Sequence, residues 1–95
     1  MTRMDAFHRK VQELTDLFER KNKNYGDSVF EPSSLAPNIT PSEAVMVRMS
    51  DKIKRIETLL KGEKDRVGES LRDTFTDLAV YTIILLILLD EEEAE

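Results

Sequence analysis

Apolar residues recur at intervals of three and four along residues 4–22, and charged residues occupy the other faces of this segment. This spacing is typical of an amphipathic α-helix. The next residues read NKNYGDS, in which Asn24 and Gly26 favour the end of a helix and a turn. The pattern therefore predicts a first helix over residues 4–22, whose apolar stripe comprises Phe7, Val11, Leu14 and Phe18.

A second helix is predicted to begin sharply at the sequence TPSE. Thr40 can cap the helix, Pro41 suits its first position, and Glu43 can complete a capping box. The sequence KGEKDRVG ends the apolar periodicity, and Gly62 is its predicted stop. The apolar stripe of this helix comprises Val45, Met49, Ile53, Ile56 and Leu60.

Between these two helices, a loop is predicted over about residues 25–39, interrupted by Pro32 and Pro37. Loops of this length are uncommon in small domains and often form lids or binding loops.

A third helix is predicted from about residues 67–69 to residue 91, and its second half is almost entirely apolar. The apolar run over residues 78–89 is too short for a membrane span, which needs roughly 20 residues. Its sequence IILLILL is apolar on every side, which indicates a core or subunit-interface helix.

These elements predict an all-α fold, a three-helix bundle over residues 1–89 that is completed by oligomerisation. So short a chain has a thin core, and association into a homodimer or homotetramer would cover the apolar third helix. Residues 90–95 are predicted to form an acidic, frayed tail.

The formal net charge of −5 comes from this tail, because the rest of the chain has equal numbers of acidic and basic residues. A neutral body disfavours direct binding to nucleic acid or to anionic membranes. The chain has no cysteine, which excludes disulfides and fits a cytoplasmic location, and its first residues contain no apolar export signal.

Glu69, Asp73 and Asp77 recur every four residues and would form one acidic stripe on the third helix. The stripe continues into apolar positions, so it is predicted to face protein or the rim of a cavity. Asp73 and Asp77 lie inside the predicted helix, where Asp is unfavourable without a capping role. A divalent cation such as Mg²⁺, or Mn²⁺, would compensate the repulsion between these carboxylates.

Two acids of the second helix, Glu43 and Asp51, could join this metal site if the two helices pack face to face. Structural interpretations remain open for each acid. Glu43 could serve only the capping box, and Glu69 could serve only as an acid near a helix start. The carboxylates could also form salt bridges with basic residues of the second helix, namely Arg48, Lys52 and Arg55.

The sequence KNKNYG places Lys21, Lys23 and Tyr25 at the mouth of the long loop, where they could hold a phosphate or a base. The alternative is a solvated helix end with favourable C-terminal cations. His8 is the single histidine, which disfavours a histidine-dependent mechanism.

Three stretches together resemble a known family: KNKNYGDS, SEAVMVRMSDKIKRIETLL and VGESLRDTFTDLAVYTIIL. They are similar to the nucleotide modification associated domain of phages and prophages, a MazG-like relative within the all-α nucleoside triphosphate pyrophosphohydrolases. The resemblance covers residues 21–89. It implies a MazG-like helical bundle in a dimer or tetramer, located in the host cytoplasm where a phage encodes it.

The resemblance also implies Mg²⁺-dependent cleavage of a nucleoside triphosphate between the α and β phosphates. The predicted catalytic acids are Glu43, Asp73 and Asp77, and Asp51 and Glu69 complete the predicted metal ligands. The nucleotide, which could be a modified one, would be held by Lys21, Lys23, Tyr25, Arg48, Lys52 and Arg55.

The second helix departs from the E-E-x-x-E pattern of the broader group, because Ala44 and Val47 stand at two of the acidic positions. Two further hypotheses therefore stay open. The protein could be a nucleotide-binding or sequestering module with weak or no hydrolysis, or a structural oligomerisation protein whose acids are salt-bridged.

Overall fold

The computed structural model describes residues 1–25, 27–62 and 68–94, and for residues 24 and 25 it describes the backbone alone. The chain forms α1 (Arg3–Tyr25), the short 3-10 helix η1 (Ser28–Phe30), α2 (Pro41–Leu60) and α3 (Leu71–Ala94). No strand occurs in these residues, so the predicted all-α class is confirmed. Within the part of the chain that the structure describes, none of the helices is long and apolar enough to cross a membrane.

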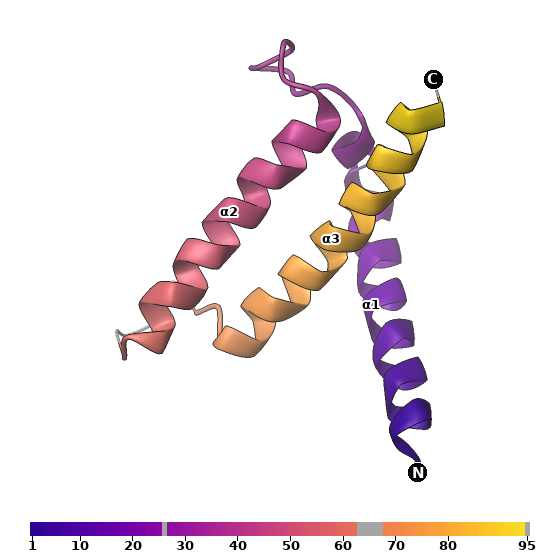
Figure 1. The fold of residues 1–95 in the computed structure, drawn as a ribbon, viewed down its shortest axis with the longest axis vertical. Coiled ribbons are helices and arrows are strands. Elements are labelled where there is room, and N and C mark those ends of the chain that lie inside the picture. The colour runs from indigo at the N-terminus through magenta and orange to yellow at the C-terminus, as the bar shows by residue number, and fades with distance from the viewer. Residues whose placement is uncertain (26, 63–67, 95) are drawn as a thin grey trace.

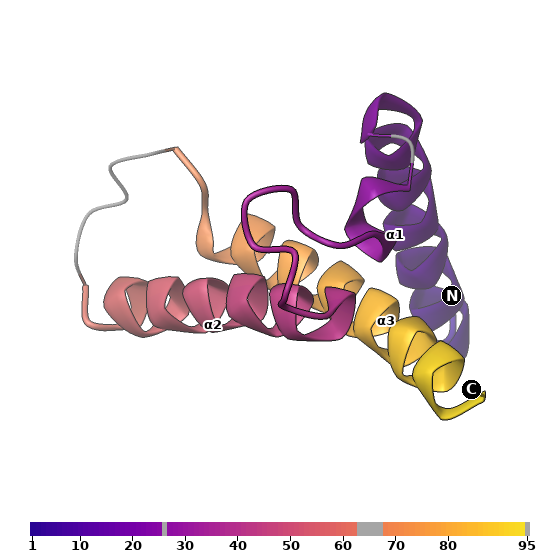
Figure 2. The same cartoon turned by 90° about the horizontal axis from the view of Figure 1, so that it is seen from above.

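Helices α2 and α3 run side by side, and α1 crosses α3 near the C-terminal end of α1 (Figures 1 and 2). The N-terminal half of α1 projects away from the other two helices (Figure 1). Accordingly, Phe7 and Val11 are exposed, although the sequence pattern places them on the apolar stripe of α1. Leu14 and Phe18, one and two turns further along, pack against the core.

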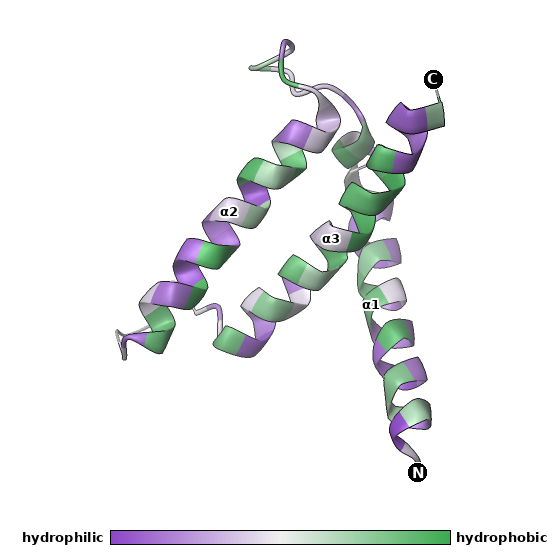
Figure 3. Cartoon of the chain, viewed as in Figure 1, coloured by the Kyte–Doolittle hydropathy of each residue, from purple (hydrophilic) through white to green (hydrophobic). Residues whose placement is uncertain are grey.

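The core lies between α2 and the middle of α3, the strongly hydrophobic stretch that precedes the hydrophilic end of this helix in Figure 3. Of the predicted α2 stripe, Val45 and Ile56 are buried, whereas Ile53 and Leu60 are exposed. The exposed pair shows that α2 turns only part of its apolar side toward α3. The buried cluster comprises Val45, Val80, Ile84 and Leu88.

Each of the three α-helices begins with a side chain that accepts a hydrogen bond from the backbone of the third residue beyond it. In α2, Thr40 accepts the backbone N–H of Glu43, and the Glu43 carboxylate accepts the backbone N–H of Thr40, which confirms the predicted capping box. The same reciprocal pairs join Thr2 to Asp5 before α1 and Ser70 to Asp73 before α3. Such pairs satisfy backbone donors that the first helical turn leaves without partners.

The ends of the helices agree with the sequence in most places. Helix α2 stops at Leu60, and Gly62 has a φ of +85°, the left-handed conformation for which glycine is suited. Helix α1 continues three residues beyond its predicted end. Helix α3 begins at Leu71, later than predicted, because Ser70 caps it, and it continues through the acidic segment to Ala94 with exposed side chains.

Candidate functional site

Lys52 of α2 lies between two carboxylates that belong to the third-helix region of the sequence. Its Nζ is 2.8 Å from Oε1 of Glu69 and 3.0 Å from Oδ2 of Asp77. The three side chains are only 20%, 25% and 18% exposed, respectively. Lys52 therefore neutralises part of the predicted acidic stripe from the neighbouring helix.

The second oxygen of Glu69 is also occupied. Its Oε2 lies 2.8 Å from Nε of Arg55 and accepts a hydrogen bond from the Thr74 hydroxyl at 2.9 Å. The Arg55 guanidinium donates a further hydrogen bond to the backbone oxygen of Glu69. Salt bridging by Lys52 and Arg55, one of the alternatives from the sequence, is thus confirmed, and it fixes the segment just before α3 onto α2.

The charges of this network shift its acid–base equilibria. The hydrogen bond from Lys52 lowers the pKa of Glu69, and burial opposes this only in part. Burial raises the pKa of Asp77, but hydrogen bonds and charges from Lys52 and Lys21 outweigh it and lower the pKa overall. Burial likewise disfavours the charged form of Lys52, yet its two carboxylate partners raise its pKa. All three groups are therefore held in their charged forms at neutral pH.

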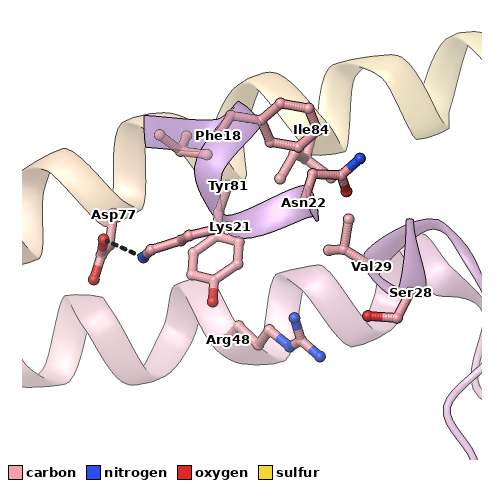
Figure 4. Close-up of a pocket in the computed structure, with 10 residues that line it drawn as sticks. Phe18, Lys21, Asn22, Ser28, Val29, Arg48, Asp77, Tyr81 and Ile84 are labelled. Carbon is pink, nitrogen blue, oxygen red and sulfur yellow. Dashed lines mark hydrogen bonds and ion pairs between the residues drawn. The ribbon is translucent and has the colours of Figure 1, made fainter. Parts of the chain in front are cut away.

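A groove of about 470 Å³ opens between α1, η1, α2 and α3 (Figure 4). Lys21 of α1 reaches its wall, where Nζ lies 3.3 Å from Oδ1 of Asp77. The guanidinium carbon of Arg48, which also lines the groove, lies 6.0 Å from the centre of the Tyr81 ring. Apolar side chains form much of the remaining wall, namely Phe18, Val29, Val80 and Ile84.

This groove combines two positive side chains with an apolar surface. Lys21 and Arg48 can donate hydrogen bonds to an anionic group, and Arg can do so with two donors at once. Phe18 and Tyr81 offer aromatic surface to a flat, uncharged part of a ligand. The volume lies within the range of about 300–1,000 Å³ that is usual for small-molecule sites. The groove can therefore accept an organic anion of moderate size.

Asp77 also lines a second, more open hollow of about 310 Å³. Three of the predicted metal ligands, Glu69, Asp73 and Asp77, line it, together with Thr76 and Leu17. Asp77 borders both this acidic hollow and the groove. The two cavities thus share one carboxylate.

The other predicted acids do not join this arrangement. Glu43 is exposed and bound to Thr40 in its capping box, and Asp51 is exposed on α2.

Asp73 lines the acidic hollow but also has a capping role, which its predicted position inside the helix did not allow. Its carboxylate accepts the N–H of Ser70. The stripe faces protein as predicted at Glu69 and Asp77, but Asp73 is exposed.

A resident divalent cation needs several carboxylate oxygens directed at one point. Within residues 1–25, 27–62 and 68–94, no group of three or more His, Cys, Asp or Glu side chains could hold a metal ion. The predicted convergence of five acids is therefore not observed. Glu69 and Asp77 come together, but they do so around the Lys52 ammonium, so in this arrangement the acids do not fit a bound Mg²⁺.

The predicted substrate-binding residues likewise do not all lie at one place in the structure. Lys21 and Arg48 line the groove, whereas Lys52 and Arg55 are engaged with Glu69. Lys23 is exposed at the end of α1, and the side chain of Tyr25 lies outside the described residues.

Sequence reasoning missed several residues of the site. Thr74 is fully buried, and its hydroxyl donates to both Glu69 and the backbone oxygen of Ser70. The sequence did contain a signal for Thr74, because it is a polar residue within a helix that was predicted to be buried. Asn22 and Ser28 line the groove because η1 folds back toward α1, which no local pattern indicates.

Comparison with known proteins gives one match. The family described as Nucleotide modification associated domain 1 matches residues 21–89, which include every residue that lines the groove except Phe18. Neither a curated protein nor a solved structure matches the chain.

Proposed function

Because this chain belongs to the Nucleotide modification associated domain 1 family, we propose that it binds a nucleotide in the groove between α1, η1, α2 and α3. The observation that carries this proposal is the placement of Lys21 and Arg48 beside an apolar wall within one cavity. Phosphate oxygens would contact the two cations, and the base would lie against the apolar and aromatic side chains. The family description names nucleotides, and the groove supplies matching chemistry.

The ion pairs around the groove favour this orientation of the ligand. Asp77 would repel phosphate if it were uncompensated, but it is paired with Lys21 and Lys52. A phosphate that approaches Lys21 competes with Asp77 for that cation, while Lys52 keeps Asp77 partly neutralised. Arg48 has no such competition from Asp77 in the structure, so its guanidinium is the first candidate for a phosphate contact.

Nucleotide binding is tested by thermal unfolding and calorimetry with nucleoside mono-, di- and triphosphates, each in EDTA and in Mg²⁺. Binding to the folded state raises the melting temperature in proportion to the logarithm of ligand concentration. The Arg48→Met variant should lose this shift, and Lys54→Met, an exposed lysine on the same helix, should keep it. No shift with any nucleotide in either condition would refute the proposal.

The second candidate is hydrolysis of a nucleoside triphosphate to the monophosphate and pyrophosphate with Mg²⁺ or Mn²⁺. What favours it is the acidic hollow, where Glu69, Asp73 and Asp77 lie beside the groove and Asp77 borders both cavities. Against it stands the pairing of Glu69 and Asp77 with Lys52. The same nucleotide panel decides between enzyme and binder when pyrophosphate release is measured. Binding without release identifies a sequestering module.

Association of copies is part of the proposal. Exposed apolar side chains occur on the free half of α1, at Phe7 and Val11, and on α3, at Ile83, Leu86 and Ile87. A homodimer or homotetramer would cover them. Light scattering coupled to size-exclusion chromatography measures the subunit number, and a monomer at micromolar concentration would contradict this part of the proposal.

A further inference from the structure

The position of Lys52 has a consequence for cations. Its ammonium touches one oxygen of Glu69 and one of Asp77, so it stands between two carboxylates in the place where a bridging cation would neutralise both. The ammonium is tethered to α2, and the carboxylates belong to the α3 region, 17 and 25 residues away. The packing of α2 against α3 therefore fixes this contact.

A free divalent cation must displace the ammonium before it can bridge these carboxylates. Displacement would leave a mostly buried positive charge without its partners, and an unpaired charge in such a position is costly. The tethered ammonium also loses no translational entropy when it contacts the carboxylates, whereas a free ion does lose translational entropy when it binds there. Both effects favour Lys52 over Mg²⁺ at this position.

We infer that Lys52 is a built-in counter-ion that takes the place of a divalent cation between Glu69 and Asp77, and that it keeps this pair closed to Mg²⁺ and Mn²⁺ in the protein without nucleotide. The inference goes beyond the proposed nucleotide binding, because it concerns the unliganded protein. It explains why acids at helical spacing, which indicate a metal site by sequence, come together without forming one. Any metal dependence of the protein would then require a ligand that disturbs the Lys52 contacts.

The test is a titration of Mn²⁺ without nucleotide, followed by electron paramagnetic resonance of the free ion. Lys52→Met keeps most of the side-chain length and removes the charge. This variant should bind Mn²⁺ on the order of tenfold more tightly than wild type, since the charge of the ligand set strongly tunes cation affinity. Lys54→Met removes a lysine from an exposed position of the same helix and should behave as wild type.

A second substitution assigns the gain to this pair. Lys52→Met combined with Asp77→Asn should return Mn²⁺ affinity to the wild-type level, because one of the two carboxylates is then neutral. If Lys52→Met binds Mn²⁺ no better than Lys54→Met, or if wild type already binds Mn²⁺ as tightly as Lys52→Met, the inference is wrong.

Folding of the variant is itself a readout. Circular dichroism in EDTA and in millimolar Mn²⁺ shows whether Lys52→Met is helical. A variant that unfolds in EDTA and regains helicity in Mn²⁺ supports the inference, because the metal replaces the missing ammonium. A variant that stays unfolded in both conditions counts against it. Neither result depends on nucleotide binding, so failure here leaves the proposed function to be judged by its own experiment.

Discussion

The ammonium of Lys21 lies 3.3 Å from Oδ1 of Asp77, a residue 56 positions later in the sequence. The other carboxylate oxygen of Asp77, Oδ2, lies 3.0 Å from the ammonium of Lys52. Asp77 on α3 is therefore tied to α1 by one oxygen and to α2 by the other. One carboxylate at the rim of the groove links all three helices.

The first prediction follows from this link. Asp77→Asn should lower the free energy of unfolding by about 1–3 kcal/mol, because two lysines lose their charged partner and Lys52 is mostly buried. Urea denaturation monitored by circular dichroism measures the change. Asp51→Asn removes the same charge from an exposed position on α2 and should change stability by less than about 0.5 kcal/mol. Equal effects of the two variants would contradict the role assigned to Asp77.

The second prediction separates capping from catalysis at the start of α2. Thr40→Ala should cost about 1 kcal/mol of stability, as is usual for loss of a capping side chain. Glu43→Gln should keep the reciprocal hydrogen bond, since glutamine also completes a capping box. The unfolding free energies of the Thr40→Ala and Glu43→Gln variants are measured by urea denaturation.

The same variants test whether Glu43 takes part in chemistry. Glu43 lines neither the groove nor the acidic hollow, so Glu43→Gln should leave nucleotide affinity and any pyrophosphate release at the wild-type level. A loss of release in a stably folded Glu43→Gln protein would restore Glu43 to the catalytic set predicted from the sequence.

The sequence predicts the helices well because local signals determine them. Thr40, Pro41 and Glu43 mark the start of α2, and Gly62 follows its end in a positive-φ conformation. The start of α3 is the exception. The S-x-x-D pair of Ser70 and Asp73 is a capping signal, but the four-residue spacing of the acids resembles a continuous helical stripe.

The site is less predictable because it depends on how the helices are rotated against each other. Periodicity places Lys52 and Asp77 on their own helices but does not specify that their side chains meet. Both a metal site and salt bridges are compatible with the same acids and bases. Packing of α2 on α3 decides between them by bringing Lys52 and Arg55 to Glu69.

The third prediction concerns the stability of the protein at acidic pH. Glu69 and Asp77 have pKa values below their ordinary values of 4.5 and 3.8, so the unfolded chain binds protons more readily than the folded protein. Their contribution to stability is complete above the unfolded values and is lost as the pH falls through the folded ones. The unfolding free energy of wild type should therefore decrease between about pH 5 and pH 3.

Glu69→Gln provides the comparison, because it removes one of these titrations. Its stability at pH 7 should be lower than that of wild type, and the two curves should converge toward pH 3. Parallel curves over this range would show that the Lys52 and Arg55 contacts of Glu69 do not contribute to the acid sensitivity.

The last prediction distinguishes two lysines that lie two residues apart. Lys21 lines the groove, whereas Lys23 is exposed at the end of α1 and is not part of the groove wall. Lys21→Met should weaken nucleotide binding by about tenfold or more, because a hydrogen bond to a charged group contributes roughly 1.5–3 kcal/mol. Lys23→Met should change the affinity by less than about threefold, which corresponds to long-range attraction alone.

Calorimetric titration of Lys21→Met and Lys23→Met at one salt concentration makes the comparison. Since Lys21→Met also removes a partner of Asp77, each variant is titrated well below its own melting temperature. Equal losses in the two variants would mean that the phosphates bind at the end of α1, in which case the groove between the helices is not the nucleotide site.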